Sequence, residues 1–105
     1  MRHSAVIEVR QTEAFKSWLV ELRDIRARAI IIRRLDAAGL GNLGDVGSVG
    51  DGVSEMRIHH GPGYRVYFAR RGQALIVLLC GGDKSSQTRD IRRAQKMAQA
   101  LSEEP

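Results

Sequence analysis

Hydrophobic and polar residues alternate through the middle of the chain with a period of two, which is typical of β-strands. Residues 53–59 place apolar side chains on one side (Met56 and Ile58) and polar side chains on the other (Glu55, Arg57 and His59). The sequence that follows, His60-Gly61-Pro62-Gly63, is rich in turn-forming residues. We therefore predict a strand that ends near residue 59 and a tight turn after it.

Two further strands are predicted beyond this turn. Residues 64–68 alternate again, with Val66 and Phe68 on one face and Arg65 and Tyr67 on the other. Residues 74–80 are apolar on both faces, which indicates a central strand. We expect the three strands to form an antiparallel meander, one face of which carries a row of polar and cationic side chains.

The first part of the chain predicts a short strand over residues 4–9 and then two helices. Thr12 is the expected N-cap of the first helix, whose apolar stripe contains Phe15, Trp18, Leu19 and Leu22. Asp24 is the expected N-cap of the second helix, and Gly39 is its expected end. The expected inner face of this helix consists of Ile25, Ala29, Ile32 and Leu35, with Ile31 and Ala38 beside it.

A glycine-rich loop and a last helix complete the pattern. Residues 39–52 hold six glycines, which predicts turns, with weak pairing of residues 45–48 to the sheet. Ser85 or Ser86 is expected to cap a helix over residues 87–101, whose inner face holds Ile91, Ala94, Ala98 and Leu101. The predicted order is β-α-α-β-β-β-α. It is an α+β fold with a twisted antiparallel sheet and helices packed on one face.

Length and composition narrow the class of protein. A chain of 105 residues suits a single domain over residues 1–105. No apolar run is long enough to span a membrane, and Glu8 precedes any run of signal-peptide length, so we expect a cytoplasmic protein. The lone Cys80 is expected in the core. No metal and no cofactor are expected, because the sequence contains no ligand cluster or cofactor motif.

The positive charge is concentrated in one part of the chain. Residues 55–96 hold nine Arg and Lys against three acids, which is +6, and the rest of the chain is −1, for a total of +5. Such a one-sided basic field favours a polyanionic partner, either nucleic acid or an acidic protein. A well-solvated basic surface is the alternative.

Two segments resemble toxins of the RelE/ParE superfamily, which belong to bacterial toxin–antitoxin systems. The first is residues 55–68, a strand-turn-strand with Gly63-Tyr64-Arg65, and the second is residues 78–87, with Gly82-Asp83-Lys84 after the central strand. Both are similar to the HigB-like branch, the addiction module killer proteins. The resemblance covers nearly the whole chain.

The resemblance implies a function and a partner. The partner is an antitoxin encoded by a neighbouring gene, often a helix-turn-helix protein. Many relatives are endoribonucleases that cut mRNA on the ribosome without a metal and so inhibit translation. The ParE branch instead poisons DNA gyrase, so a toxin without enzymatic activity remains an alternative. A member that only binds its antitoxin is another.

RNA cleavage of this kind needs a base for the 2′-OH, a partner for the phosphorane charge and a proton for the leaving 5′-oxygen. Arg65 matches the arginine that such nucleases place against the scissile phosphate, and a guanidinium can grip two phosphate oxygens. Lys84 is the expected second cation or acid, and Arg57 is the third cation. Glu55 is the last catalytic candidate, although a carboxylate paired with arginine is a poor base.

The expected RNA-binding residues are Tyr64 and Tyr67, which would stack on bases, together with His59, Arg89, Arg92 and Arg93. Either His59 or His60 is a candidate base, but not both, because neighbouring residues of a strand point to opposite sides. The last helix begins Gln87-Thr88-Arg89-Asp90-Ile91 and lacks the tyrosine that some ribosome-dependent nucleases carry there. The alternatives without cleavage therefore stay open.

Overall fold

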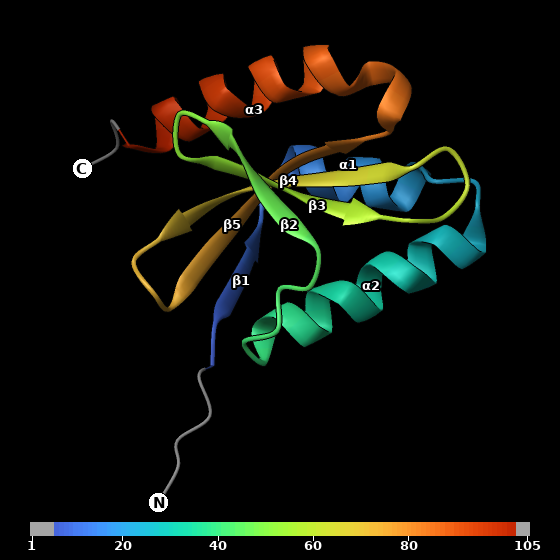
Figure 1. Ribbon diagram of the computed structural model, residues 1–105, viewed down its shortest axis with the longest axis horizontal. Coiled ribbons are helices and arrows are strands. Elements are labelled where there is room, and N and C mark those ends of the chain that lie inside the picture. The colour runs from blue at the N-terminus through green and yellow to red at the C-terminus, as the bar shows by residue number, and fades with distance from the viewer. Residues whose placement is uncertain (1–5, 103–105) are drawn as a thin grey trace, which may run out of the picture.

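The computed structural model describes residues 6–102. Five strands form one sheet in the order β1-β5-β4-β3-β2 (Figure 1). Along the chain the elements are β1 (Glu8–Gln11), α1 (Glu13–Glu21), α2 (Ile25–Gly39), β2 (Val46–Gly50), β3 (Val53–Ile58), β4 (Tyr64–Arg71), β5 (Leu75–Gly82), the short 3-10 helix η1 (Lys84–Ser86) and α3 (Gln87–Ser102). The α+β prediction is confirmed.

The two outer strands differ from the prediction. β1 pairs in parallel with β5, so the sheet is mixed and not wholly antiparallel. It spans Glu8–Gln11 and not residues 4–9, of which residues 4 and 5 lie outside the described part of the chain. β2 is a full edge strand, paired antiparallel with β3, where only weak pairing was expected.

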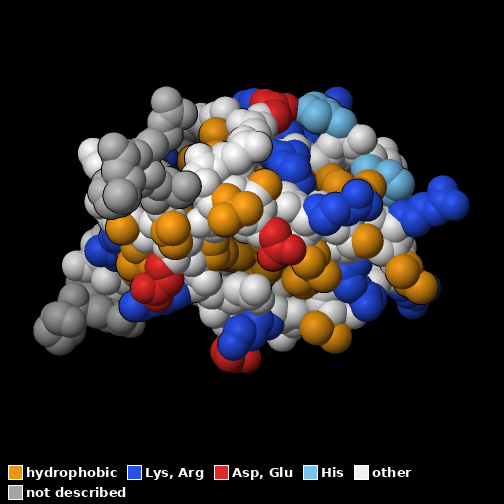
Figure 2. Space-filling model, turned by 90° about the horizontal axis from the view of Figure 1, so that it is seen from below, with side chains coloured by type: hydrophobic (Ala, Val, Ile, Leu, Met, Phe, Trp, Pro, Cys, Tyr) orange, Lys and Arg blue, Asp and Glu red, His pale blue; other side chains and the backbone are white. Residues whose placement is uncertain are grey.

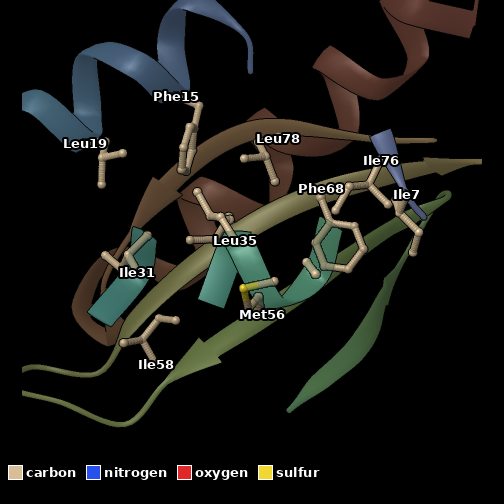
Figure 3. Packing of buried hydrophobic residues seen from close by; sticks show 12 residues of the cluster. Ile7, Phe15, Leu19, Ile31, Leu35, Met56, Ile58, Phe68, Ile76 and Leu78 are labelled. Carbon is tan, nitrogen blue, oxygen red and sulfur yellow. The ribbon is translucent and has the colours of Figure 1, made fainter. Parts of the chain in front are cut away.

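Helices α1 and α2 pack on one face of the sheet and enclose the larger core. Their caps are as predicted, because Thr12 accepts a hydrogen bond from Phe15 N and Asp24 accepts one from Ala27 N. Figure 3 shows the apolar side chains of both helices pointing at those of the strands. The sheet contributes Met56, Ile58, Val66, Phe68, Ile76 and Leu78 to this cluster.

The predicted inner face of α2 is right for Leu35 but wrong for Ile25, Ala29 and Ile32. Its buried residues are Ala27, Ile31, Leu35 and Ala38. Ile25 is 75% exposed and Ile32 is 43% exposed. The helix carries apolar residues on two stripes, and the stripe that meets the sheet is the one that includes Ala27, whose small side chain allows close packing. Figure 2 views the molecule from the α2 side and shows hydrophobic side chains scattered among Arg and Lys.

Helix α3 lies across the opposite face of the sheet from α2 (Figure 1). Its Ala94 and Ala98 pack on a second, smaller core that holds Val53, Tyr67, Ala69, Leu79 and Cys80. Because Val66 and Phe68 face the first core and Tyr67 and Ala69 face the second, β4 alternates as predicted. Helices therefore cover one face, as expected, and α3 adds a partial cover to the other.

Candidate functional site

The cationic residues meet where β4 begins and β5 ends. The strand register places Arg57 opposite Arg65, and Arg65 opposite Gly82. Directly paired residues on adjacent strands have Cα atoms about 4.5–5.5 Å apart, so these three positions lie in one row. Lys84 follows Gly82 by two residues and therefore reaches the same edge.

The two glycines that end β5 allow side chains to press against both sides of the strand. A Cβ atom at Gly81 would lie 2.4 Å from the Trp18 ring, and a Cβ atom at Gly82 would lie 1.8 Å from Asp90 Oδ2. Only glycine therefore allows α1 and α3 to close on the end of β5. This contact gives a physical reason for the Gly-Gly pair that precedes Lys84.

Glu55 is a buried anchor between three elements. It is 5% exposed, and its carboxylate accepts hydrogen bonds from Arg57 Nε at 3.0 Å and Gln87 Nε2 at 2.9 Å. Arg65 Nε lies 3.8 Å from its Oε1. Both carboxylate oxygens are engaged, so in this conformation Glu55 is placed to hold β3, β4 and α3 together and not to accept a proton from a ligand.

Arg65 is turned inward. It is 8% exposed, and its Nη1 donates to the carbonyl oxygens of Gly63 and Tyr64 at 3.2 and 3.1 Å. Its Nε has no hydrogen-bond partner among the described residues. A two-pronged grip on a phosphate requires free N–H groups at the surface. Nη1 is bonded to the two carbonyls and Nε is buried, so in this conformation Nη2 is the nitrogen left for a phosphate.

Lys84 is the exposed cation beside Arg65. The carbons Cβ and Cδ of Lys84 lie 3.7 Å from the position that a Cβ atom would take at Gly63, and Arg65 Nη1 lies 3.5 Å from the same point. The backbone of Lys84 is fixed by Asp83, whose carboxylate accepts a hydrogen bond from Ser85 N at 2.8 Å in a capping box. The pKa of Asp83 is lowered, mainly by a second hydrogen bond, which the Ser85 hydroxyl donates to the same carboxylate, and also by the bond from Ser85 N. Asp83 is thus the N-cap of η1, which runs directly into α3, and Ser86, one of the two expected caps of the last helix, is the other member of this capping box.

Asp45, to which the sequence assigned no role, connects two predicted site residues, Arg57 and His59. Asp45 Oδ1 accepts a hydrogen bond from Arg57 Nη1 at 2.9 Å, and Oδ2 lies 2.6 Å from His59 Nε2. The bond to His59, and next that to Arg57, lowers the pKa of Asp45. Arg57 crosses Gly47, where a Cβ atom would lie 2.5 Å from Nη2, so a side chain there would block its path. The feature of the sequence that points to Asp45 is the weak strand predicted to begin there. The register of this strand with β3 brings Asp45 next to Arg57.

The two histidines point to different sides, as predicted. His60 Nε2 lies 3.0 Å from Asp24 Oδ2 and so connects the β3–β4 turn with the N-cap of α2. His59 is exposed beside Asp45. Of the two, His59 shares the Asp45 carboxylate with Arg57, so it is the one that can approach a ligand at the cationic row.

The two tyrosines differ in how far they are buried. Tyr67 is 0% exposed beneath α3, which corrects the expectation that it stacks on a base. Its hydroxyl has no hydrogen-bond partner among the described residues, and burial raises its pKa. Tyr64 is partly buried, with its ring edge-on to Trp18 at 6.3 Å. Tyr67 is therefore taken up by packing between β4 and α3, whereas Tyr64 keeps part of its surface open.

The arginines of α3 form an open cationic surface. Arg89, Arg92 and Arg93 are exposed and line a hollow of about 790 Å³, together with Ser85, Ser86, Thr88 and Lys96. None of these four cations forms an ion pair with a carboxylate among residues 6–102. Free cations along a helix are suited to a polyanion.

Residues 6–102 contain neither a group of side chains for a metal ion nor a helix that could span a membrane. No three His, Cys, Asp or Glu side chains group so that they could hold a metal ion. No helix is both long and apolar enough to cross a membrane.

The five-stranded mixed sheet with its three helices is consistent with the RelE-like fold. The family model for phage-derived protein Gp49-like (DUF891) matches residues 17–101, so the chain belongs to this family, which is of the toxin–antitoxin type. A Haemophilus influenzae protein, described as an uncharacterized protein, is 47% identical over 95 residues, which are 90% of this chain and 96% of that protein.

Proposed function

We propose that the protein is a HigB-like toxin that cuts mRNA on the ribosome, without a metal, and is held inactive by a helix-turn-helix antitoxin encoded beside it. Membership of a toxin family supports the toxin role. The observation that carries the nuclease part is the position of Lys84, an exposed cation near Arg65. It directly precedes Ser85 and Ser86, which line the hollow that holds the open cations of α3. Strong positive charge at one point of a longer basic surface suits a scissile phosphate.

The side chains present allow a balanced reaction. The 2′-oxygen bonds to phosphorus while the bond from phosphorus to the 5′-oxygen breaks, which leaves a 2′,3′-cyclic phosphate and a 5′-hydroxyl. His59, oriented by Asp45, accepts the 2′-OH proton. Lys84 pairs with the phosphate and donates a proton to the 5′-oxygen. Arg65 contributes its charge from below, where the low dielectric strengthens it.

Expression of the chain alone in a bacterial host tests this proposal. We expect growth arrest, early loss of protein synthesis and new 5′ ends in messages. Lys84→Ala should relieve all three, with a loss of cleavage on the order of 10²–10³-fold. Lys16→Ala, which removes an exposed lysine of α1, is the matched control and should arrest growth like the parent. Unchanged cleavage by Lys84→Ala would overturn the assignment.

The buried position of Arg65 favours a second candidate, a toxin without chemistry that binds a protein such as DNA gyrase. If Arg65 never reaches the surface, its role is to hold the β3–β4 turn through Gly63 and Tyr64. The same experiment separates the two candidates. Arrest with intact messages and a DNA-damage response would exclude the nuclease and support gyrase, and absence of arrest would leave a member that only binds its antitoxin.

A further inference from the structure

A second hollow lies at the far end of β4 from Lys84. It encloses about 720 Å³ between α3, the β2–β3 turn and the last residues of β4. Its walls carry Arg70, Arg71, Arg92, Lys96, Gln95 and Gln99. Sequence analysis assigned no role to five of these six residues.

The charge in this hollow is unbalanced. Arg70, Arg71, Arg92 and Lys96 form no ion pair with a carboxylate among residues 6–102. The acidic residue in the wall, among those residues, is Asp51. Like charges that share a concave surface repel one another, so the hollow is stabilised when an anion enters it.

The hollow continues the surface that begins at Lys84. Arg92 and Lys96 line both this hollow and the one near the start of α3. Arg65 and Arg71 lie on the same face of β4, six residues apart, which is about 20 Å along a strand. A single extended ligand that crosses α3 can therefore reach both ends.

We infer that this hollow is a second anion-binding site, which holds the phosphate backbone of a single-stranded RNA about 20 Å from Lys84. The inference shares with the proposed function that the ligand is RNA, but it does not require that the RNA is cut. The site would set affinity for the strand through contacts that are independent of base sequence.

The composition of the walls favours RNA over an acidic protein segment. Apart from the cations, the walls offer the amides of Gln95 and Gln99 and the hydroxyl of Ser102, and their apolar side chains are only Ala69 and Ala98. Protein partners are held mainly by large apolar or aromatic anchors in fitted pockets, and these walls provide none. A sugar-phosphate backbone needs charges and hydrogen-bond donors, which the walls supply.

Binding of a short RNA with 2′-O-methyl riboses tests the inference, because that RNA lacks the attacking hydroxyl. The probe is measured with the full chain between about 50 and 200 mM salt. Each lost phosphate contact lowers the salt slope by about 0.7 for a single strand, so Arg70→Ala/Arg71→Ala should lower it by about 1.4 and weaken binding about tenfold near physiological salt. Arg23→Ala/Arg26→Ala is the matched control, since it removes two exposed arginines at the start of α2.

The outcomes are distinct. A loss confined to Arg70→Ala/Arg71→Ala supports the site, even if messages stay intact when the parent chain is expressed and the nuclease proposal fails. An equal loss in the control would overturn it, because net charge would then explain the effect. If Arg70→Ala/Arg71→Ala loses polyglutamate binding as strongly as RNA binding, the inference is also overturned, in favour of an acidic protein ligand. Unchanged RNA binding by this variant would overturn it as well.

Discussion

Replacement of Glu55 by alanine should destabilise the fold strongly, because it leaves a buried charge without its partner. Glu55 is buried and joins Gln87, Arg57 and Arg65. Removal of one member of a buried ion pair costs about 3–5 kcal/mol. We expect about 3 kcal/mol, the lower end of that range, because Arg65 keeps its two carbonyl partners and its Nε stands 3.8 Å from the carboxylate.

Urea unfolding followed by the fluorescence of Trp18, the single tryptophan, measures this loss. With a slope of about 1–1.5 kcal/mol/M for a chain of this size, the midpoint of Glu55→Ala should fall by about 2–3 M. Asp45→Ala is the control. It also takes a carboxylate from Arg57, but an exposed one, and it should move the midpoint little.

A double variant checks the physical cause. Glu55→Leu/Arg65→Leu removes both charges and should recover much of the stability lost in Glu55→Leu, since a buried ion pair can be replaced by apolar residues at little cost. A midpoint for Glu55→Ala equal to that of the parent would refute the reasoning. Glu55 would then not be needed to stabilise the fold, and a catalytic role for its carboxylate would again be the explanation to test.

Other predictions concern packing, capping and ionisation. Gly81→Ala should lower the free energy of unfolding by about 1–3 kcal/mol, because the Trp18 ring must move off the strand. The emission of Trp18 should shift to longer wavelength for the same reason. Thr12→Ala should lower the free energy of unfolding by about 1–2 kcal/mol, because Thr12 caps α1 and donates to β5. The pKa of Asp83 is lowered in the folded protein, so its contribution to stability is full above its ordinary pKa of 3.8 and is lost as pH falls through the folded value. Asp83→Asn should therefore make the melting temperature depend less on pH below about pH 4. Burial raises the pKa of Cys80 to about 11, so its alkylation at neutral pH should be slow until urea unfolds the chain. Rapid alkylation of the folded chain would contradict this burial.

The strands of the meander could be predicted because their side chains alternate and one turn has a distinctive sequence. Val66 and Phe68 are buried on one side of β4 and Tyr67 on the other, as the pattern indicates. Residues with strong local preferences, such as Thr12 and Asp24 at the helix caps, could be placed for the same reason.

Only part of the inner face of α2 could be predicted, because the choice between its two apolar stripes depends on what the helix meets. Ile25 and Ile32 form a stripe as regular as that of Ala27 and Ile31. Hydrophobicity alone favours the larger isoleucines, but a helix that approaches a sheet closely needs small residues at the contact. The parallel pairing of β1 with β5 is likewise set by the path of the chain around α1 and α2, and no local pattern encodes it.

The sequence predicted which residues form the site, but not which of them are structural and which can meet a ligand. That difference depends on burial, which the alternation of a strand does not reveal. Arg57, Arg65 and Lys84 do come together, because register is set by the strands. Arg65 and Glu55 are buried, whereas Lys84 is exposed and lies near Arg65 at Gly63. A loss of toxicity in Arg65→Ala would therefore not distinguish lost chemistry from a disturbed β3–β4 turn. Lys84→Ala changes an exposed side chain, so its effect on message cleavage, compared with its unfolding midpoint, reports on the chemistry itself.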